Sequence, residues 1–404
     1  MILADASTWP LLVTALAALS ASYLLVAIAG VLAFSRQGRA APDAPDLVPI
    51  TVLKPICGHD AQLLDNLRSF CRQDYPAYQV VFGVHDADDP AVPVIEQVIA
   101  EHPERDLVLV VDGRVTGANP KVSNLANMVR EAKHDIIAIA DADIRIERHY
   151  LKKLAMAFHD PEVGAATSLY SGSATGGLPS KLGAMFVNDW FLPSALVSNA
   201  FRELTFCFGA TMAVRRDILR RIGGLQALAP YLADDYMLGR LVSERGAKVR
   251  LIPVLVENVI HEASLKGLFL HELRWARTMK SVEPLGYGMA FVTDALPIAI
   301  LCCALLTAMT GSLAYPAAGL ALVLALRVLL HYVVLSALRL NQPATPWLIP
   351  LRDCLTFWVR LASFAGQKVS WRGQELSVRA GSRLELDPER NADDEVAVSK
   401  PPVL

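Results

Sequence analysis

Long apolar segments at both ends of this chain constrain its fold more than any other feature. The first is an uncharged run from Leu11 to Phe34, and a helix needs about 20 apolar residues to cross a bilayer core. The alternative is a signal peptide, whose apolar core is about 7–15 residues long and follows basic residues. Here Asp5 is the only charged side chain before the run, and Arg36 and Arg39 follow it. The positive-inside rule therefore predicts a membrane anchor with residues after 35 in the cytoplasm.

Two more apolar segments, from Met289 to Gly311 and from Tyr315 to Ser336, predict a transmembrane helical hairpin. The chain is 53% hydrophobic and 19% charged, against about 25% charged in soluble domains, which also indicates a membrane part. Asp294, Arg327 and His331 fall inside these spans. Because ionisable groups are costly in lipid, we expect these three to face the helix bundle or the interface.

Two further segments leave alternatives open. The amphipathic pattern from Pro346 to Gly366 favours a helix lying in the membrane interface, and a fourth span with a polar stripe is the alternative. The apolar stretch from Leu178 to Phe201, interrupted by Asn188 and Asp189, predicts either an interfacial surface or a core helix. The polar face of the first segment consists of Arg352, Thr356, Arg360, Ser363 and Gln367.

The residues between the apolar ends predict an α/β domain with a mostly parallel sheet. Short apolar runs alternate with stretches of helical apolar spacing, which is typical of βαβ units. The runs are apolar throughout, as expected for strands buried on both faces. Ligands bind beyond the carboxyl ends of such strands, so we expect site residues directly after them. The predicted strands are 49–53, 78–84, 107–111 and 136–140, and the predicted helices are 60–71, 92–100, 122–133 and 236–244.

Acidic residues follow two of these strands. Asp141 and Asp143 come directly after the strand 136–140, where two carboxylates in one turn can hold Mg²⁺ or Mn²⁺ together with the phosphates of a ligand. Asp86 follows the strand 78–84 and can accept hydrogen bonds from a nucleobase or ribose. A solvated turn is the alternative for each, and we favour binding because of the position after a buried strand.

Three further groups complete the candidate site. Lys121, with Asn119 before it, starts the helix after the third strand and suits a phosphate or ribose contact. Asp234 and Asp235 start a later helix, where acids also favour the helix dipole, and Asp235 is the candidate general base for an attacking hydroxyl. In the run His271-Glu272-Leu273-Arg274-Trp275, the arginine can pair with a diphosphate, and the tryptophan offers a flat face for a sugar or an interface anchor.

The order of these motifs resembles inverting GT-A glycosyltransferases of the ceramide glucosyltransferase type. That family carries three separated aspartates followed by (Q/R)-x-x-R-W, which Asp86, Asp141, Asp235 and the pair Arg274-Trp275 match, while His271 stands at the Q/R position. The stretches at 53–58, 117–125 and 370–373 are similar as well. The resemblance implies a Rossmann-like GT-A fold, a UDP-sugar donor and a lipid acceptor, with Lys54, Asn119, Asp234 and His271 also binding substrate.

HELRW and the segment 72–84 resemble most the bacterial hopanoid-associated branch of that family. This implies transfer of N-acetylglucosamine from its UDP ester to bacteriohopanetetrol by a multi-pass protein of the bacterial inner membrane, with its catalytic domain in the cytoplasm. The alternatives are a UDP-glucose:ceramide glucosyltransferase and a processive polysaccharide synthase, which usually needs more spans. A transporter or scaffold fits the acid-rich α/β domain poorly.

A net charge of -2 gives no support for nucleic-acid binding, which usually needs a basic stripe. The acidic, polar residues from Glu385 onward predict a disordered tail. The predicted parts are an anchor (1–35), a cytoplasmic catalytic domain (36–288), a transmembrane hairpin (289–337), an interfacial helix or fourth span with the SWRG segment (338–384) and the tail (385–404).

Overall fold

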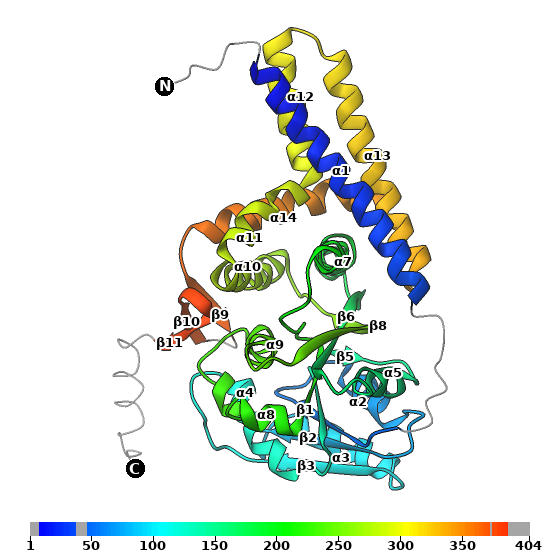
Figure 1. Cartoon of the computed structure of the whole chain (residues 1–404), viewed down its shortest axis with the longest axis vertical. Helices are drawn as coiled ribbons and strands as arrows, with labels where there is room; N and C mark the ends of the chain where they lie inside the picture. The colour runs from blue at the N-terminus through cyan, green and yellow to red at the C-terminus, as the bar shows by residue number, and fades with distance from the viewer. Residues whose placement is uncertain (1–7, 38–46, 372–373, 387–404) are drawn as a thin grey trace, which may run out of the picture.

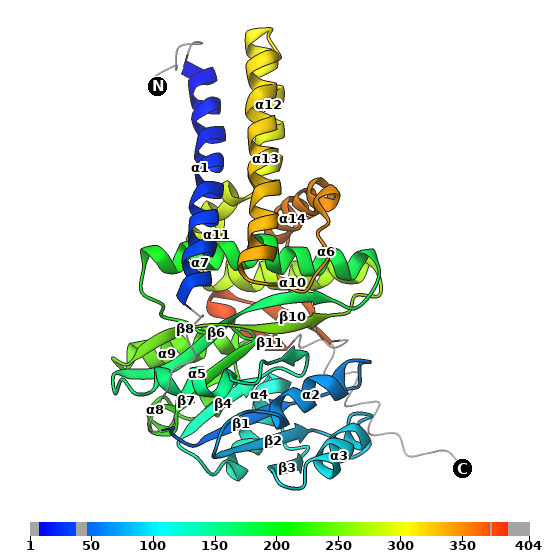
Figure 2. The same cartoon turned by 90° about the vertical axis from the view of Figure 1, so that its right-hand side faces the viewer.

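The computed structural model describes residues 8–37, 47–371 and 374–386 (Figure 1). An α/β domain lies at one end and a bundle of long helices at the other, with a layer of crosswise helices between them (Figure 2). The predicted tail falls outside the described residues from 387 onward. At Glu385 and Leu386 the prediction of disorder is wrong, because both belong to strand β11 (Leu384–Leu386).

The four predicted strands form one edge of an eight-stranded sheet with the order β3-β2-β1-β4-β7-β6-β8-β5. They pair in parallel, as predicted. Strands β1, β2 and β4 are buried along their whole length, which explains their continuous apolar sequences. Their bounds are β1 (Ile50–Pro55), β2 (Tyr78–Val84), β3 (Asp106–Val111) and β4 (Ile136–Ala140).

The other half of the sheet is mixed. Strand β7 runs antiparallel to both β4 and β6, β6 is parallel to β8, and β5 is antiparallel to β8. None of these four strands was among the predicted ones. Their bounds are β5 (Ile144–Arg145), β6 (Val163–Ala174), β7 (Thr211–Arg215) and β8 (Lys248–Ile260).

Helices cover both faces of the sheet and bury two apolar cores. Helices α2 (Leu63–Cys71), α3 (Val92–Glu101) and α5 (Tyr150–Ala157) contribute to one core. On the opposite face lie the helices that begin at the candidate site, together with a short helix after β7. These are α4 (Pro120–Met128), α8 (Arg216–Arg221) and α9 (Asp234–Glu244), with the short 3-10 turns η1 (Val129–Glu131) and η3 (Leu225–Leu228).

The bundle contains α1 (Thr8–Gln37), α12 (Ala295–Thr310) and α13 (Ala314–Ala337), and α12 and α13 form the predicted hairpin (Figure 1). Helices α1 and α13 are each long and apolar enough to cross a membrane. A third span exists only if α12 is joined with the preceding segment Pro284–Thr293, from which it bends by 65°. That segment comprises α11 (Pro284–Met289) and η4 (Ala290–Thr293).

The span predicted from Met289 to Gly311 thus contains a bend near its start. At the bend, the backbone of Asp294 is non-helical (φ -81°, ψ 54°), and its buried carboxylate pairs with Arg360 of helix α14 (Ile349–Phe364). A carboxylate held sideways by a neighbouring helix fixes the chain in this bent path, because leaving it unpaired in an apolar environment is costly.

The crosswise layer connects the sheet to the bundle (Figure 2). The stretch 178–201, for which surface and core remained open, forms α6 (Leu178–Phe186), the π-helical turn η2 (Val187–Phe191) and α7 (Leu192–Phe201). It is largely buried between β6 and the bundle, although Phe201 at its end is 77% exposed. Helix α10 (Leu265–Val282), which carries HELRW, lies in the same layer.

Helix α14 (Ile349–Phe364), after the turn η5 (Pro346–Leu348), lies across the foot of the bundle (Figure 1). Its predicted polar stripe faces the protein: Arg352, Thr356, Arg360 and Ser363 are buried, whereas Trp358 and Phe364 are exposed. A crosswise helix with an outward apolar face fits the interfacial arrangement better than a fourth span.

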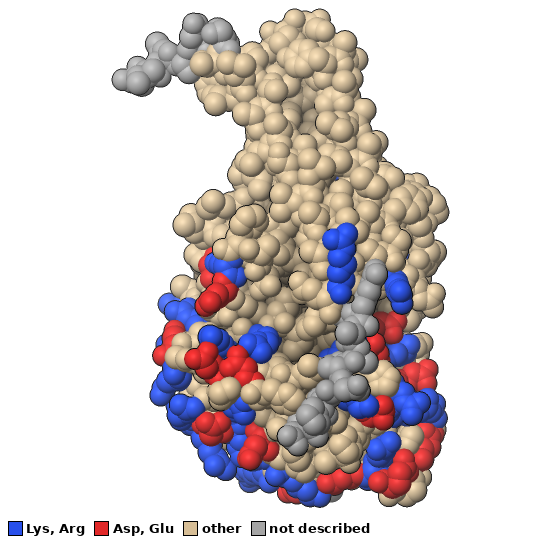
Figure 3. Space-filling model, turned by 45° about the vertical axis from the view of Figure 1, so that its right-hand side comes forward, with Lys and Arg blue, Asp and Glu red and all other residues tan. Residues whose placement is uncertain are grey.

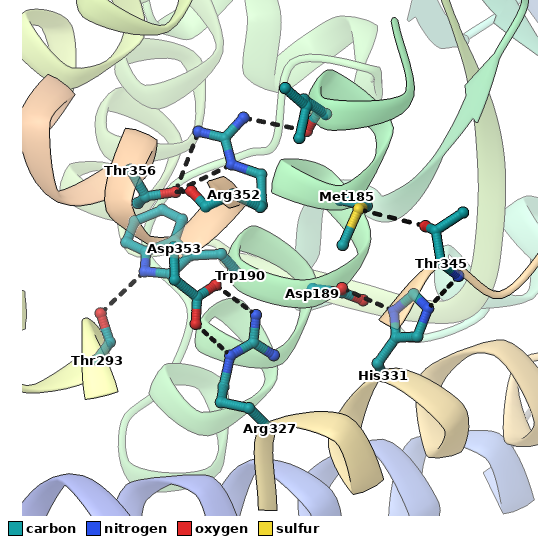
Figure 4. Close-up of polar contacts among 11 residues, drawn as sticks. Met185, Asp189, Trp190, Thr293, Arg327, His331, Thr345, Arg352, Asp353 and Thr356 are labelled. Atoms are coloured by element: carbon teal, nitrogen blue, oxygen red, sulfur yellow. Dashed lines mark hydrogen bonds and ion pairs between the residues drawn. The ribbon is translucent and has the colours of Figure 1, made fainter. Parts of the chain in front are cut away.

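Buried ion pairs hold this layer together. Both guanidinium nitrogens of Arg352 pair with the carboxylate of Glu272, each at 2.7 Å, and both side chains are 1% exposed. Arg327 pairs with Asp353 at 2.6 Å. His331 Nδ1 donates a hydrogen bond to Asp189 Oδ2 at 2.8 Å, and its Nε2 accepts one from Thr345 N–H at 3.1 Å (Figure 4). The prediction that Asp294, Arg327 and His331 face the protein interior is thereby confirmed.

Charge on the molecular surface is segregated. In Figure 3, Lys, Arg, Asp and Glu crowd the α/β domain, and the surface of the bundle is almost free of them. This is the distribution expected when the bundle lies in a bilayer and the α/β domain in water.

The described C-terminal residues form a small antiparallel sheet with the order β11-β10-β9. Besides β11, it contains β9 (Lys368–Trp371) and β10 (Gln374–Val378), with the turn η6 (Ala380–Ser382) before the last strand.

The Glu272–Arg352 pair offers a test of this packing. We expect Glu272→Ala to cost roughly 3–5 kcal/mol, because it leaves a buried guanidinium without its counter-charge. Thermal unfolding of the purified protein in detergent measures the loss. The control Glu244→Ala removes half of the exposed i,i+4 pair with Arg240, and we expect it to cost under about 1 kcal/mol. Equal shifts for the two variants would contradict the account.

Candidate active site

Lys121, the second residue of α4, joins two acidic turns that are far apart in the sequence. Its Nζ lies 2.7 Å from Oδ1 of Asp141, directly after β4, and 3.1 Å from Oδ2 of Asp234, at the start of α9. Burial opposes the charged form of Lys121, but the two carboxylates outweigh it and raise the pKa of the ammonium group. The structure thus brings three of the predicted residues together.

Lys54 of β1 holds the turn that contains Asp141. Its side chain is fully buried, and Nζ donates to the carbonyl oxygens of Asp141 (2.6 Å) and Ile144 (3.3 Å) while lying 4.0 Å from the Phe70 ring centroid. Burial lowers the pKa of Lys54 to about 7. Lys54 therefore supports the Asp141 turn from inside the protein, and its predicted role in substrate binding stays a prediction.

Asp143 lies in the same turn, near β8. Burial and the neighbouring Asp141 raise the pKa of Asp143 to about 6, and Asn258 donates to its Oδ2 at 3.3 Å. Two like-charged carboxylates this close fit a divalent cation, which would offset their repulsion. Within the described ranges there is no group of three or more His, Cys, Asp or Glu residues that could hold a metal. Phosphates and water must therefore complete the shell of such an ion, as is usual for Mg²⁺.

Asp235 is half-buried at the start of α9 and differs from its neighbour Asp234 in having no lysine bound to it. Burial and the charge of Asp234 raise the pKa of Asp235 to about 7, and Tyr236 N–H donates to its Oδ1 at 2.8 Å. Gly209 lies opposite: a Cβ there would come within 2.7 Å of Asp235 Oδ2. A carboxylate with these properties can accept a proton near neutral pH.

The motif on α10 packs as an aromatic cluster. His271 Nδ1 lies 2.7 Å from Glu262 Oε1, and its ring is 4.3 Å from the Trp275 ring, which stacks on Phe186. Arg274 is half-buried on the same helix.

Two predicted residues have other surroundings. Asp86 is exposed after β2 and accepts a hydrogen bond from Asp88 N–H at 3.0 Å; in the described ranges no hydrogen bond or ion pair joins it to Lys121. Asn119 is fully buried: its Oδ1 caps α4 at Val122 N–H, and its Nδ2 donates to Tyr231 O. Asn119 thus caps α4, and its predicted substrate contact stays a prediction.

Tyr170 was missed by the sequence reasoning. Burial, with the charges of Asp235, Asp143 and Asp141, raises the pKa of the Tyr170 hydroxyl on β6. No local pattern marks Tyr170, because β6 takes its place in the sheet only through long-range pairing with β7 and β8.

Comparisons with known proteins identify the family and the fold of this chain. The pattern described as Glycosyl transferase family 21 matches residues 12–384. Ceramide glucosyltransferase 1 of Caenorhabditis elegans is 26% identical over 233 residues, which are 57% of this chain and 50% of that protein. A ceramide glucosyltransferase of Gibberella zeae is 32% identical over 146 residues, 34% of this chain and 26% of that protein. The chain thus spans about half the length of these curated relatives, or less.

Among solved structures, the mannosyltransferase PcManGT of Pyrobaculum calidifontis, in complex with GDP-Man and Mn²⁺, is similar with a TM-score of 0.52. It is 22% identical, and the match covers 87% of this chain and 99% of that chain. At this identity the likeness establishes the fold, and the predicted Rossmann-like GT-A architecture is confirmed.

Removal of one carboxylate tests whether the Asp141–Asp143 turn holds a cation. We expect Asp143→Asn to weaken Mn²⁺ binding roughly 10-fold or more in the presence of UDP, because an amide oxygen carries no charge to offset that of the ion. Electron paramagnetic resonance of free Mn²⁺ measures the affinity. The control Asp217→Asn changes an exposed acid at the start of α8. Unchanged affinity in Asp143→Asn would rule the turn out as the metal site.

Proposed function

We propose, from the premise that this chain belongs to glycosyl transferase family 21, that it transfers a sugar from a nucleoside diphosphate to a lipid hydroxyl with inversion. The observation that carries this proposal is the pairing of Lys121 with both Asp141 and Asp234, which joins the turn of Asp141 and Asp143 to the start of α9, where Asp235 follows Asp234. Sugar transfer needs charge compensation on the donor side and a base on the acceptor side. The turn with Asp141 and Asp143 would supply the charge compensation, and Asp235 at the start of α9 would supply the base.

On the donor side, Asp141 and Asp143 would hold the divalent cation. When bound, such an ion offsets the charge of the departing diphosphate. Lys121 can transfer its contact from Asp141 to a phosphate, since both are anionic partners. We propose that Arg274 of α10 adds a second cation for the diphosphate and that Asp86, after β2, binds the nucleoside. The fold accommodates such a donor elsewhere, because PcManGT holds GDP-Man with Mn²⁺.

On the acceptor side, Asp235 takes the proton of the attacking hydroxyl. Its pKa of about 7 lets it be ionised at neutral pH and still accept a proton efficiently. The hydroxyl then attacks the anomeric carbon from the face opposite the diphosphate, which inverts the configuration there. Trp275, stacked on Phe186, offers an apolar face to the sugar or to the lipid.

The membrane presents the acceptor to this site. His271 and Trp275 lie on α10, which packs against α14 within the crosswise layer (Figure 2). A lipid anchored in the bilayer is therefore concentrated beside Asp235. We assign the α/β domain to the cytoplasmic side, since Arg36 at the end of α1 lies next to it.

For the substrates, we propose UDP-N-acetylglucosamine as donor and bacteriohopanetetrol as acceptor, in a bacterial inner membrane. The support is the likeness of HELRW and of residues 72–84 to the hopanoid-associated branch. UDP-glucose and ceramide are the second candidate pair, because curated relatives are named ceramide glucosyltransferases.

Membranes containing the protein distinguish these pairs. Each radiolabelled UDP-sugar is offered with each lipid, and we expect label from UDP-N-acetylglucosamine on the hopanoid. Label from UDP-glucose on ceramide would keep lipid glycosylation and overturn the hopanoid assignment. Absence of a labelled lipid with every pair would contradict the proposed function.

The role of Asp235 is tested by Asp235→Asn. We expect kcat to fall roughly 10²–10⁴-fold, because the amide cannot accept the proton, while UDP binding stays close to that of the unchanged protein. In the unchanged protein, kcat should fall as the pH drops through about 7, since protonation of Asp235 removes the base. Asp217→Asn is again the control. Full activity in Asp235→Asn, or a flat pH profile between 5 and 8, would exclude Asp235 as the base.

A further inference from the structure

The C-terminal sheet β9–β11 packs against the segment that leads into the acidic start of α9. Tyr231 and Arg383 form an antiparallel bridge, and Leu384 N–H donates to Pro230 O at 2.8 Å. Val369 and Leu384 bury their side chains there against Leu232. These contacts join two segments that lie about 150 positions apart in the sequence, and the first segment ends just before Asp234 and Asp235.

Ser382 makes the central contacts of this junction. Its carbonyl oxygen accepts from Leu232 N–H at 2.8 Å, and its hydroxyl oxygen accepts from Ala233 N–H at 2.7 Å. The side chain is fully buried. Helix α9 begins after Ala233 without a side-chain cap of its own. The hydroxyl of Ser382 therefore holds the backbone of Ala233 in place, directly before Asp234 and Asp235.

The backbone of Ser382 adopts a conformation that is unusual for a residue other than glycine. Its φ is +63°, in the left-handed region that favours glycine and is strained for other residues. Glycine precedes it, at 381, also with positive φ. A second glycine would relieve the strain at 382 but would leave Ala233 N–H without its acceptor. Strained residues of this kind persist where the surroundings hold them, often at functional sites.

The other side of the same sheet is attached to the helix that carries HELRW. Arg277, two residues after Trp275, donates to Ala365 O at 2.6 Å and to Lys368 O, at the beginning of β9. Tyr236 of α9 also donates to Glu283 Oε1, at the end of α10, at 2.8 Å. The small sheet therefore bridges α10 and α9.

We propose that Ser382 is a positioning residue for sugar transfer, and that the sheet β9–β11 sets the placement of Asp235 relative to Arg274 and Trp275 by bridging α9 and α10. This inference rests on the proposed role of Asp235 as the base. Ser382 does not touch the reacting atoms; it acts through Ala233. A displacement of the base by about 1 Å is enough to slow catalysis by up to 10²-fold.

The test uses full-length protein in nanodiscs and the variants Ser382→Ala and Ser382→Gly. We expect kcat to fall roughly 10-fold or more in both, with KM for the donor changed by less than about 3-fold, because the donor side is left in place. Amide hydrogen exchange at Leu232 and Ala233 should become faster, since the hydroxyl acceptor is gone. Ser377→Ala, the same change in β10, is the matched control and should change none of these quantities.

Ser382→Gly separates positioning from stability, because it relieves the left-handed strain and should melt no earlier than Ser382→Ala. A kcat equal to that of the unchanged protein in Ser382→Gly would overturn the proposal. The proposal would also be overturned if amide exchange at Ala233 were as slow in both variants as in the unchanged protein. If Asp235→Asn keeps full activity, the proposed base fails. If Asp235→Asn is inactive and the Ser382 variants are fully active, only the positioning role fails.

Discussion

The ammonium group of Lys121 between Asp141 and Asp234 is the interaction on which the site depends. It joins the turn after β4 to the start of α9, which are otherwise separated by the strands β5 to β7. Without this cation, three neighbouring carboxylates would repel one another in a partly buried place. With it, Asp141 remains available to a metal and a diphosphate, and Asp235 is left without a lysine partner. A donor side and an acceptor side thus arise within one cluster.

The membrane part is coupled to this cluster through the crosswise layer. Glu272, between His271 and Arg274 on α10, pairs with Arg352 of α14, whose apolar face points outward. The motif helix is therefore fixed to the helix that fits the membrane interface. Buried pairs of this kind add little net stability, because desolvation offsets their attraction. Their effect is to specify one arrangement, in which Trp275 keeps a fixed position relative to the lipid surface.

Sequence reasoning succeeded where the signal was local. The four parallel strands are continuous apolar runs, so the fold class and the position of Asp141 directly after a buried strand were both predictable. It failed where pairing over long distances decides. Strands β6 and β8 pair with each other although they lie far apart in the sequence. Lys54 and Asn119 donate to backbone groups more than 80 positions away, and Asp294, where the span bends, pairs with Arg360 of α14. Ser382 acts on residues that no spacing rule connects to it.

Two acidic turns on opposite sides of the reacting carbon imply a single displacement, and the product's anomeric configuration tests this most directly. The measurement is nuclear magnetic resonance of the glycolipid formed from an α-linked UDP-sugar, read at the anomeric proton. The account predicts a β-linked product, since Asp235 activates the hydroxyl on the face opposite the diphosphate. An α-linked product would mean retention of configuration and would contradict the role of Asp235 as the base of an in-line attack.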